Sequence, residues 1–170
     1  MAADSFYGPA LDYCYEAGWV NGVSYVEFAP GSTCVRAQVV TFLWRAAGCP
    51  EPAGEENPFV DVSKGDFYYQ SELWAVENGI TAGTDGSHFS PLGDCNRAQV
   101  VTFLWRAFGQ PEPGAGPHPY TDVAAGWYEK PVIWAVEEGI TSGMSATAFG
   151  PTASCNRAQI VTFLYRAYAE

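Results

Sequence analysis

The chain has 170 residues, of which 48% are hydrophobic and 15% aromatic, so it can bury a sizeable core in one compact domain. Its net charge of −11 argues against nucleic-acid binding, which requires a basic surface. No apolar run approaches the ~20 residues of a membrane-spanning helix, so we expect no membrane insertion.

An internal repeat divides this domain into three copies. The sequences CVRAQVVTFLWRAAG, CNRAQVVTFLWRAFG and CNRAQIVTFLYRAYA begin at Cys34, Cys95 and Cys155. Arg36 and Arg97 are 61 residues apart, and Arg97 and Arg157 are 60 apart. Such a period predicts one supersecondary unit repeated and stacked, with functional features in triplicate between copies. The three copies are assigned to residues 1–49, 50–110 and 111–170.

The first predicted element of regular structure in each copy is a helix. Ser5 and Asp66 are suitable N-caps for the first two, because their side-chain oxygens can accept a free backbone N–H. A central aromatic residue gives each helix an apolar stripe that we expect to pack in the core; these residues are Tyr13, Trp74 and Trp134. A glycine follows each helix, where a left-handed terminus favours it; these are Gly18, Gly79 and Gly139.

A loop and a second helix complete each copy. Every loop ends in a Phe-x-Pro sequence, in which we expect the phenylalanine to plug the core. The Arg-Ala-Gln sequence then opens the second helix. Asn96 with Gln99, and Asn156 with Gln159, predict capping boxes, whereas Val35 predicts a weaker helix start in copy one.

Linkers rich in Pro and Gly, at 49–58 and 110–119, separate the copies. They lead into Phe59–Val62 and Tyr120–Val123, which we expect to pair as short strands or to lie extended over a neighbour. Copy one has no counterpart, so we expect it to be clipped at its N-terminus. The predicted fold is mainly α: three tandem helix–loop–helix repeats with short extended segments between them.

The five cysteines are odd in number and lack C-x-x-C spacing, which argues against a disulfide framework and a zinc site. Cys34, Cys95 and Cys155 occupy the same position before the second helix. We interpret them as small buried packing residues, with a shared metal site as the alternative. We therefore expect neither a cofactor nor a bound metal.

The order F-x-D-V, aromatic helix, G-I-T-x-G loop, F-x-P and R-A-Q resembles the S-layer homology module, which usually occurs in three tandem copies. The resemblance implies a pseudo-threefold helical prism that anchors bacterial surface proteins to secondary cell-wall polysaccharide, often through pyruvylated sugars in the inter-repeat grooves. It covers about Ser5 to Ala169. The chain departs from the family's usual Thr-Arg-Ala-Glu motif, because Gln38, Gln99 and Gln159 replace the acid.

Arginines on the second helices are the leading site candidates. For Arg36, Arg97 and Arg157 the functional interpretation is a charge-assisted clamp on a ligand carboxylate. The alternative is an ion pair between copies, with Glu16, Glu77 or Glu137. The second set lies nine residues further along each helix, about 180° away, so we expect it to face elsewhere and to pair with acids or cap carbonyls. That second set is Arg45, Arg106 and Arg166.

The remaining glycan-binding candidates lie near these arginines. They are Gln38, Gln99 and Gln159 in the motif, Phe67 and Trp127 as ring platforms, and Gly83 and Gly143 as backbone donors. Phe6 occupies the same position as Phe67 in copy one. For the rings the alternative is core packing, and for the glycines it is turn geometry alone.

We therefore expect a non-catalytic module that binds cell-wall polysaccharide at the bacterial surface. No serine, cysteine or carboxylate pair is placed for catalysis with His88 or His118. The sequence MAADSFYG has no signal-peptide pattern, so we expect the chain to be part of a longer exported protein. The alternative is a protein-interaction or assembly module, with other surface proteins as partners, because Gln replaces Glu and the chain is strongly acidic.

Overall fold

The computed structural model describes residues 5–169. This part of the chain is mainly helical and contains no strand, which confirms the predicted class. Its helices are α1 (Gly8–Glu16), α2 (Arg36–Ala46), α3 (Tyr69–Glu77), α4 (Arg97–Ala107), α5 (Glu129–Glu137) and α6 (Arg157–Tyr168).

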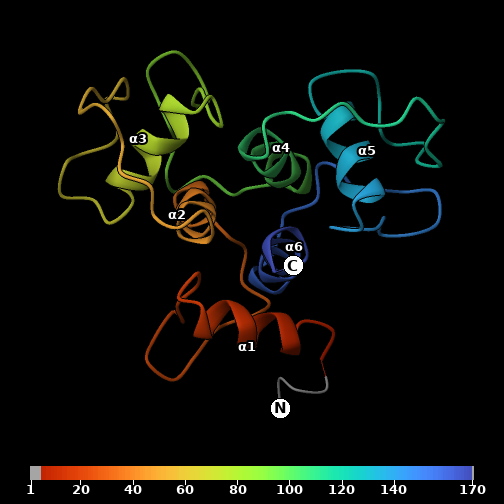
Figure 1. The fold of residues 1–170 in the computed structure, drawn as a ribbon, viewed down its shortest axis with the longest axis horizontal. Coiled ribbons are helices and arrows are strands. Elements are labelled where there is room, and N and C mark those ends of the chain that lie inside the picture. The colour runs from red at the N-terminus through yellow and green to blue at the C-terminus, as the bar shows by residue number, and fades with distance from the viewer. Residues whose placement is uncertain (1–4, 170) are drawn as a thin grey trace.

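The second helices of the three copies, α2, α4 and α6, lie at the centre of the molecule, and each carries one outer helix (Figure 1). The pairs are α2 with α3, α4 with α5, and α6 with α1. The first helix of each copy therefore packs on the second helix of the preceding copy. Because α1 packs on α6, the first and last helices of the chain lie side by side.

A closed set of backbone hydrogen bonds joins the three copies where the central helices begin. Cys34 N donates to Cys155 O, Cys95 N to Cys34 O, and Cys155 N to Cys95 O, over 2.9–3.0 Å. All three thiols are buried. Within residues 5–169 the only β-type pairing is three isolated bridges next to these cysteines, so no short strands form between the copies.

Carbonyl groups of the next copy accept hydrogen bonds from the first N–H groups of each central helix. Arg36 N donates to Gly93 O at 2.9 Å, and Ala37 N donates to Pro91 O at 3.0 Å. Copies two and three, and three and one, repeat the arrangement through Arg97 and Arg157. These bonds satisfy backbone donors that a helix cannot satisfy internally.

The hydrophobic core follows the repeat. Phe89 and Phe149 are completely buried, as expected for the plugs of their loops, and Trp74 and Trp134 are also buried. Tyr13 departs from the prediction because it is 42% exposed. Its ring instead packs edge-on against Trp19 and Tyr165, both at centroid distances of 5.3 Å.

The outer helices begin later than predicted. Their N-cap residues are tyrosines without a side-chain cap, so Ser5 and Asp66 are not the N-caps. Asp66 accepts instead from Ser63 N at 2.8 Å, which tightens the preceding turn. The glycine prediction is correct, because Gly18, Gly79 and Gly139 have φ values of 74°, 65° and 68°.

The predicted capping boxes are present on α4 and α6. Asn96 Oδ1 accepts from Gln99 N at 2.9 Å, and Gln99 Oε1 accepts from Asn96 N at 3.0 Å. On α2 only half of the box forms: Gln38 Oε1 accepts from Val35 N at 3.2 Å, but a valine side chain cannot accept in return. This difference agrees with the weaker start predicted for copy one.

All five cysteines are free, and four of them are buried. The fifth, Cys49, follows the end of α2 and is exposed. Burial raises the pKa of the Cys34 and Cys95 thiols to about 12. Within residues 5–169 no group of His, Cys, Asp and Glu is arranged to hold a metal ion.

Candidate functional site

Three grooves lie where the copies meet, and we name each by the arginine on its floor. The lining of each groove combines that arginine, the loop of the next copy, the second helix of that same next copy, and an aromatic residue ahead of an outer helix. The Arg36 groove is lined by Arg36, 81–84, Gln99, Thr102, Phe103, Arg106 and Trp127. The Arg97 groove is lined by Arg97, 141–144, Gln159, Thr162, Phe163, Arg166 and Phe6. The Arg157 groove is lined by Arg157, 21–23, Gln38, Thr41, Phe42, Arg45 and Phe67.

Residues from all three copies line every groove. In the Arg36 groove, Arg36 belongs to copy one, Gln99 to copy two and Trp127 to copy three. A groove between two adjacent copies would by itself contain parts of those two copies only. The third contribution arises because each outer helix packs on the central helix of the preceding copy, which brings its leading aromatic residue to the groove rim.

The floor arginines are almost completely buried, with 2–4% of each residue exposed. Arg97 Nε donates to Phe149 O at 3.0 Å, and one terminal nitrogen donates to Ser142 O at 2.9 Å and Thr141 Oγ1 at 3.4 Å. Its Cζ lies 4.7 Å and 5.6 Å from the ring centroids of Phe149 and Phe163. These contacts are charge-assisted hydrogen bonds and cation–π interactions, which together fix the guanidinium in place.

Arg36 and Arg157 repeat this arrangement. Arg36 Nε donates to Phe89 O at 2.8 Å, and Arg157 Nε donates to Phe28 O at 2.7 Å. No acid within residues 5–169 forms an ion pair with any of the three. The proposed partners Glu77 and Glu137 accept backbone N–H groups of the linkers instead. Burial lowers the pKa of the Arg36, Arg97 and Arg157 guanidiniums, although arginine stays charged in proteins.

The second arginine set lies on the groove walls, contrary to the expectation that it would face elsewhere. The two arginines of one helix do point in opposite directions, because Arg36 and Arg45 enter different grooves. Each groove, however, receives a floor arginine from one helix and a wall arginine from the next. Arg106 Nη1 donates to Ile80 O at 3.0 Å, and Arg166 Nη1 donates to Ile140 O at 3.3 Å. Both side chains remain more accessible than the floor arginines.

The motif glutamines line the same grooves as the arginines. Their Oε1 atoms accept from the backbone N–H of the N-cap residue, as the bonds from Val35, Asn96 and Asn156 show. Gln38, Gln99 and Gln159 are half-buried and line the grooves. Since an amide has two donors besides its acceptor, the Nε2 group can donate to a bound molecule.

Exposed aromatic rings form the groove rims. Phe67 is 70% exposed, Trp127 is 56% exposed and Phe6 is 71% exposed. Each packs edge-on against the tyrosine that follows it, with centroid distances of 5.0–5.3 Å. These residues therefore do not pack in the core, and their ring faces are available to an apolar or saccharide surface.

The loop glycines line the grooves, but their N–H groups are already used inside the protein. Gly83 N donates to Thr81 Oγ1 at 3.2 Å, and Gly143 N donates to the Tyr120 hydroxyl at 3.0 Å. A Cβ at Gly83 would lie 2.5 Å from a ring carbon of Phe59, and one at Gly143 would lie 2.4 Å from a ring carbon of Tyr120. Loop carbonyls come equally close, since His88 O would lie 2.4 Å from a Cβ at Gly83 and Ser145 O 2.5 Å from one at Gly143. Rings and backbone together therefore explain the requirement for glycine.

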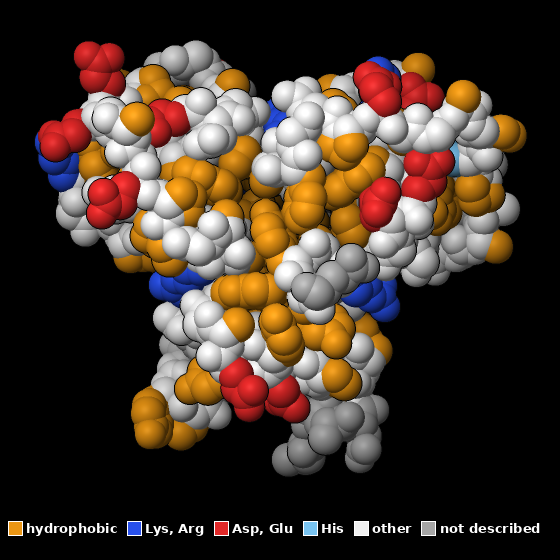
Figure 2. Space-filling model, viewed as in Figure 1, with side chains coloured by type: hydrophobic (Ala, Val, Ile, Leu, Met, Phe, Trp, Pro, Cys, Tyr) orange, Lys and Arg blue, Asp and Glu red, His pale blue; other side chains and the backbone are white. Residues whose placement is uncertain are grey.

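Charge is distributed unevenly over the molecule. All six arginines belong to the grooves, whereas Lys64 and Lys130 pair with Glu55 and Glu112 at 2.9 Å and 2.8 Å. Figure 2 shows acidic side chains mainly on the outer lobes, and basic side chains where the lobes meet as well as beside acids on two of the lobes. The grooves are therefore the basic regions of an acidic protein, and a groove of this kind concentrates anions.

The grooves differ in size and detail. Their volumes are about 380 Å³ for the Arg36 groove, 200 Å³ for the Arg97 groove and 450 Å³ for the Arg157 groove. Met144 lines the smallest groove at the position of Thr84 and Val23. In the Arg157 groove, Val20 replaces Thr81 and Thr141, so that floor arginine lacks a hydroxyl partner and uses Asn21 O.

A family model for the S-layer homology domain matches residues 58–101 and 119–161, about half of the chain. The chain belongs to the S-layer homology domain family. The matched segments lie in copies two and three, and both include an F-x-P loop and the start of a central helix. No helix within residues 5–169 is long and apolar enough to cross a membrane.

Curated relatives include surface proteins and enzymes. The chain is 25% identical over 96% of its length to an S-layer protein of Bacillus thuringiensis subsp. finitimus. It is 28% identical over 62% of its length to a cell surface protein of Thermoanaerobacter kivui, and 31% identical over 72% to an endoglucanase of Bacillus sp. (strain KSM-635). It spans 20%, 14% and 13% of these relatives, respectively. The family and these relatives support a cell-surface anchoring module.

Proposed function

We propose that this chain is a set of three S-layer homology modules that binds cell-wall polysaccharide in its grooves and so anchors a longer protein to a bacterial surface. The observation that carries the proposal is the triplicate groove with a buried arginine floor, an accessible arginine wall and an aromatic rim. An anionic sugar, such as a pyruvylated one, fits these groups. The arginines can bind its carboxylate, and the aromatic ring can pack against the face of its pyranose ring.

In each groove the same kind of residue would have the same role. In the Arg36 groove, the Trp127 ring provides a face for a pyranose, while Arg106 and the Gln99 amide donate to a carboxylate and to hydroxyl groups. The floor arginine, held by Phe89 O and Thr81, adds positive charge and shapes the base of the groove. In the Arg157 groove, Phe67 provides the ring face and Gln38 the amide donor. In the Arg97 groove, Gln159 provides the amide donor.

Copy one counts as the third module in this proposal, and together the copies form a pseudo-threefold prism. Two observations support this count. Arg157 of copy three donates to Phe28 O and Asn21 O of copy one, and α1 packs on α6 as α3 packs on α2. Without copy one, the Arg157 groove would lose its loop and the Arg97 groove its rim ring Phe6.

The proposed activity is binding without catalysis. The endoglucanase among the relatives is about eight times longer than the part that this chain matches, because the chain covers 13% of it. We therefore assign this chain to anchoring at the outer face of the cell wall, with secondary cell-wall polymer as the partner and no cofactor. The enzyme or surface structure that it carries would belong to the rest of the parent protein.

Co-sedimentation with cell-wall sacculi tests the proposal. The folded protein should pellet with intact sacculi and stay in solution after the secondary polymer has been removed chemically. Equal pelleting with both preparations would contradict polysaccharide binding. No pelleting with either, combined with concentration-dependent self-association or capture by purified surface protein, would favour the assembly function, which the change from Glu to Gln and the net charge of −11 also suggest.

A further inference from the structure

The three grooves share most of their lining, so the positions that differ can be compared directly. Every groove contains a floor arginine, a loop glycine, the motif glutamine, a threonine, a phenylalanine and a wall arginine. The volumes nevertheless differ: about 200 Å³ for the Arg97 groove, 380 Å³ for the Arg36 groove and 450 Å³ for the Arg157 groove. This difference in size therefore depends on the remaining lining positions.

Most of those positions do not follow the order of the volumes. The largest and the smallest groove both have phenylalanine as the rim ring, namely Phe67 and Phe6. The residue before the loop glycine is largest in the largest groove, where it is Asn21. Thr81 and Thr141 are identical, although their grooves differ almost twofold in volume. The position after the loop glycine is the one that remains.

At that position the smallest groove has the longest side chain. Met144 lines the Arg97 groove, whereas Thr84 and Val23 line the other two. Thr84 Oγ1 lies 2.7 Å from Ser90 Oγ and donates to His88 O at 3.2 Å, which holds this short side chain against its own loop. A thioether has no hydrogen to donate, and its longer chain occupies space that a threonine leaves free.

Glycine at position 150 makes room for this methionine. A Cβ at Gly150 would overlap the Met144 sulfur and would lie 3.1 Å from its Cγ. The equivalent residues Ala29 and Ser90 both carry a Cβ, although their φ values of 54° and 57° are left-handed like the 74° of Gly150. The backbone conformation is therefore not a sufficient reason for glycine, and the space taken by Met144 supplies one.

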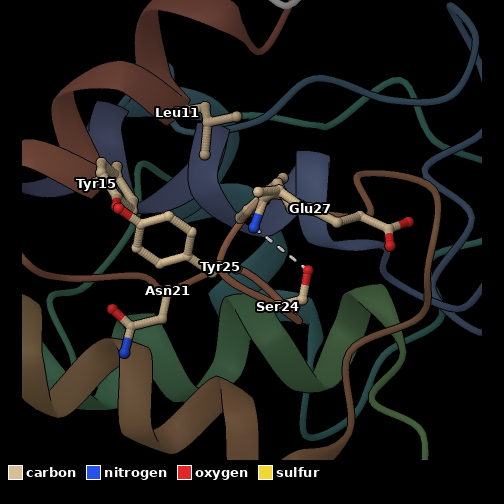
Figure 3. A pocket seen from close by; sticks show the side chains of 9 residues that line it. Leu11, Tyr15, Asn21, Ser24, Tyr25 and Glu27 are labelled. Carbon is tan, nitrogen blue, oxygen red and sulfur yellow. Dashed lines mark hydrogen bonds between the residues drawn. The ribbon is translucent and has the colours of Figure 1, made fainter.

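The loop of copy one is the opposite case. Its Asn21 and Gly22 line both the Arg157 groove and a second pocket of about 520 Å³ beside Leu11 and Tyr15 (Figure 3). This loop therefore has open space next to it in two places. A short residue after the loop glycine thus accompanies the widest groove, and the methionine accompanies the narrowest.

We propose that Met144 determines the ligand preference of the Arg97 groove and makes it the weakest of the three saccharide sites. This inference rests on the proposed function of the grooves. Small-molecule sites usually have volumes of about 300–1,000 Å³, a range that includes the Arg36 and Arg157 grooves but not the Arg97 groove. A pyruvylated sugar therefore has to displace the Met144 side chain from Gly150 before it can enter the Arg97 groove.

Nuclear magnetic resonance can follow each groove separately, because each contains one loop glycine whose amide signal reports on it. The reporters are Gly22 for the Arg157 groove, Gly83 for the Arg36 groove and Gly143 for the Arg97 groove. The probe is a methyl hexoside that carries a pyruvyl ketal. Met144→Thr copies the residue of the Arg36 groove, and Met144→Leu is the matched control because it keeps a side chain of similar volume.

In the parent, the Gly143 signal should titrate with a dissociation constant at least about tenfold higher than those of Gly22 and Gly83, as for the loss of one charge-assisted contact. Met144→Thr should bring Gly143 within about threefold of Gly83, whereas Met144→Leu should behave like the parent. Equal constants for the three glycines in the parent, or no effect of Met144→Thr, would overturn the role of Met144 and leave the proposed function intact. No shift at any of the three glycines would contradict the proposed function, and this inference with it.

The reverse exchange is an independent check. The double variant Thr84→Met/Ser90→Gly transfers the copy-three pair to copy two, and the glycine gives the new methionine the space that Gly150 gives Met144. The dissociation constant reported by Gly83 should rise about tenfold, while that reported by Gly22 should not change. An unchanged Gly83 titration would show that a methionine at this position does not restrict a groove.

Discussion

The backbone N–H of Cys34 donates to the carbonyl of Cys155 at 3.0 Å, which joins the first copy directly to the third. With the bonds from Cys95 and Cys155 it closes a ring around the middle of the molecule. Each of these residues uses its backbone for the ring while its thiol stays buried. A small apolar side chain suits this position because three copies meet there.

Thiol reactivity should follow this burial. In the folded protein we expect one cysteine, the exposed Cys49, to react quickly with a thiol reagent at pH 8, and all five to react after denaturation. The raised pKa of the Cys34 and Cys95 thiols leaves almost no thiolate at that pH. The Cys49→Ser variant is the control and should show no fast reaction. Two or more fast thiols in the native parent would contradict the buried ring.

The two arginine sets should respond differently to substitution. Replacing the wall arginines Arg45, Arg106 and Arg166 by alanine should weaken binding to soluble wall-polymer fragments by about tenfold or more, because each charge-assisted contact contributes about 1.5–3 kcal/mol. Calorimetric titration measures the affinity. The Lys64→Ala/Lys130→Ala variant is the control, since both lysines are paired outside the grooves. If this lysine variant weakens binding as much as the arginine variants, the net charge of the protein and not the groove determines the affinity.

The floor arginine Arg97 should affect stability as well. Arg97→Ala leaves Phe149 O and Ser142 O without their donor and removes the group between two phenylalanine rings. We expect the free energy of unfolding to fall by about 2–4 kcal/mol in chemical denaturation. The wall variant Arg106→Ala should lose less than about 1 kcal/mol. Equal losses of stability in the two variants would contradict the conclusion that the floor arginine is structural and the wall arginine is not.

Glu72 should make the protein more stable at acidic pH. It is completely buried in α3 and has no hydrogen-bond partner among residues 5–169. Leu11 and Val132 occupy its position in the other copies. Burial, with a contribution from the nearby charge of Asp61, raises its pKa from 4.5 to about 7. The folded state therefore binds this proton more tightly than the unfolded state, and the free energy of unfolding should fall as the pH rises from about 4.5 to about 7.

Glu72→Leu removes this titration. At pH 8 the variant should be about 2–3 kcal/mol more stable than the parent, and the difference should shrink toward pH 4. Denaturant unfolding at several pH values measures it. Glu72→Gln separates charge from polarity, because it abolishes the pH dependence but keeps a buried polar group. An unchanged pH profile in both variants would show that Glu72 does not titrate in this range.

The start of α2 can be strengthened. Val35→Asn should restore the side-chain bond that Asn96 and Asn156 make on α4 and α6, and should raise the free energy of unfolding by about 1 kcal/mol. Chemical denaturation measures the change. Val35→Ala is the control, because it shortens the side chain without supplying an acceptor. A variant with Asn no more stable than one with Ala would contradict the capping argument.

The amino-acid sequence alone was sufficient for the helical class, the repeat and the residues of the motif. These features depend on short-range rules: apolar periodicity, glycine in a left-handed terminus and the N-x-x-Q box are all local in the chain. The glutamines, the rim rings and the loop glycines could also be identified as candidates from the sequence, because the repeat shows which positions are equivalent. Their assignment to glycan binding remains a prediction.

Tertiary structure decided which elements meet. A helix period shows that Arg36 and Arg45 point in opposite directions, but not that each enters a groove completed by other copies. Likewise, an apolar stripe does not identify its partner, so the packing of α1 on α6 could not be read from it. The role of Asp61 was not predicted either. Its carboxylate oxygens accept hydrogen bonds from Phe89 N and Ser90 N, which are far from Asp61 in the sequence. Such contacts depend on the positions of whole elements, which local sequence rules do not specify.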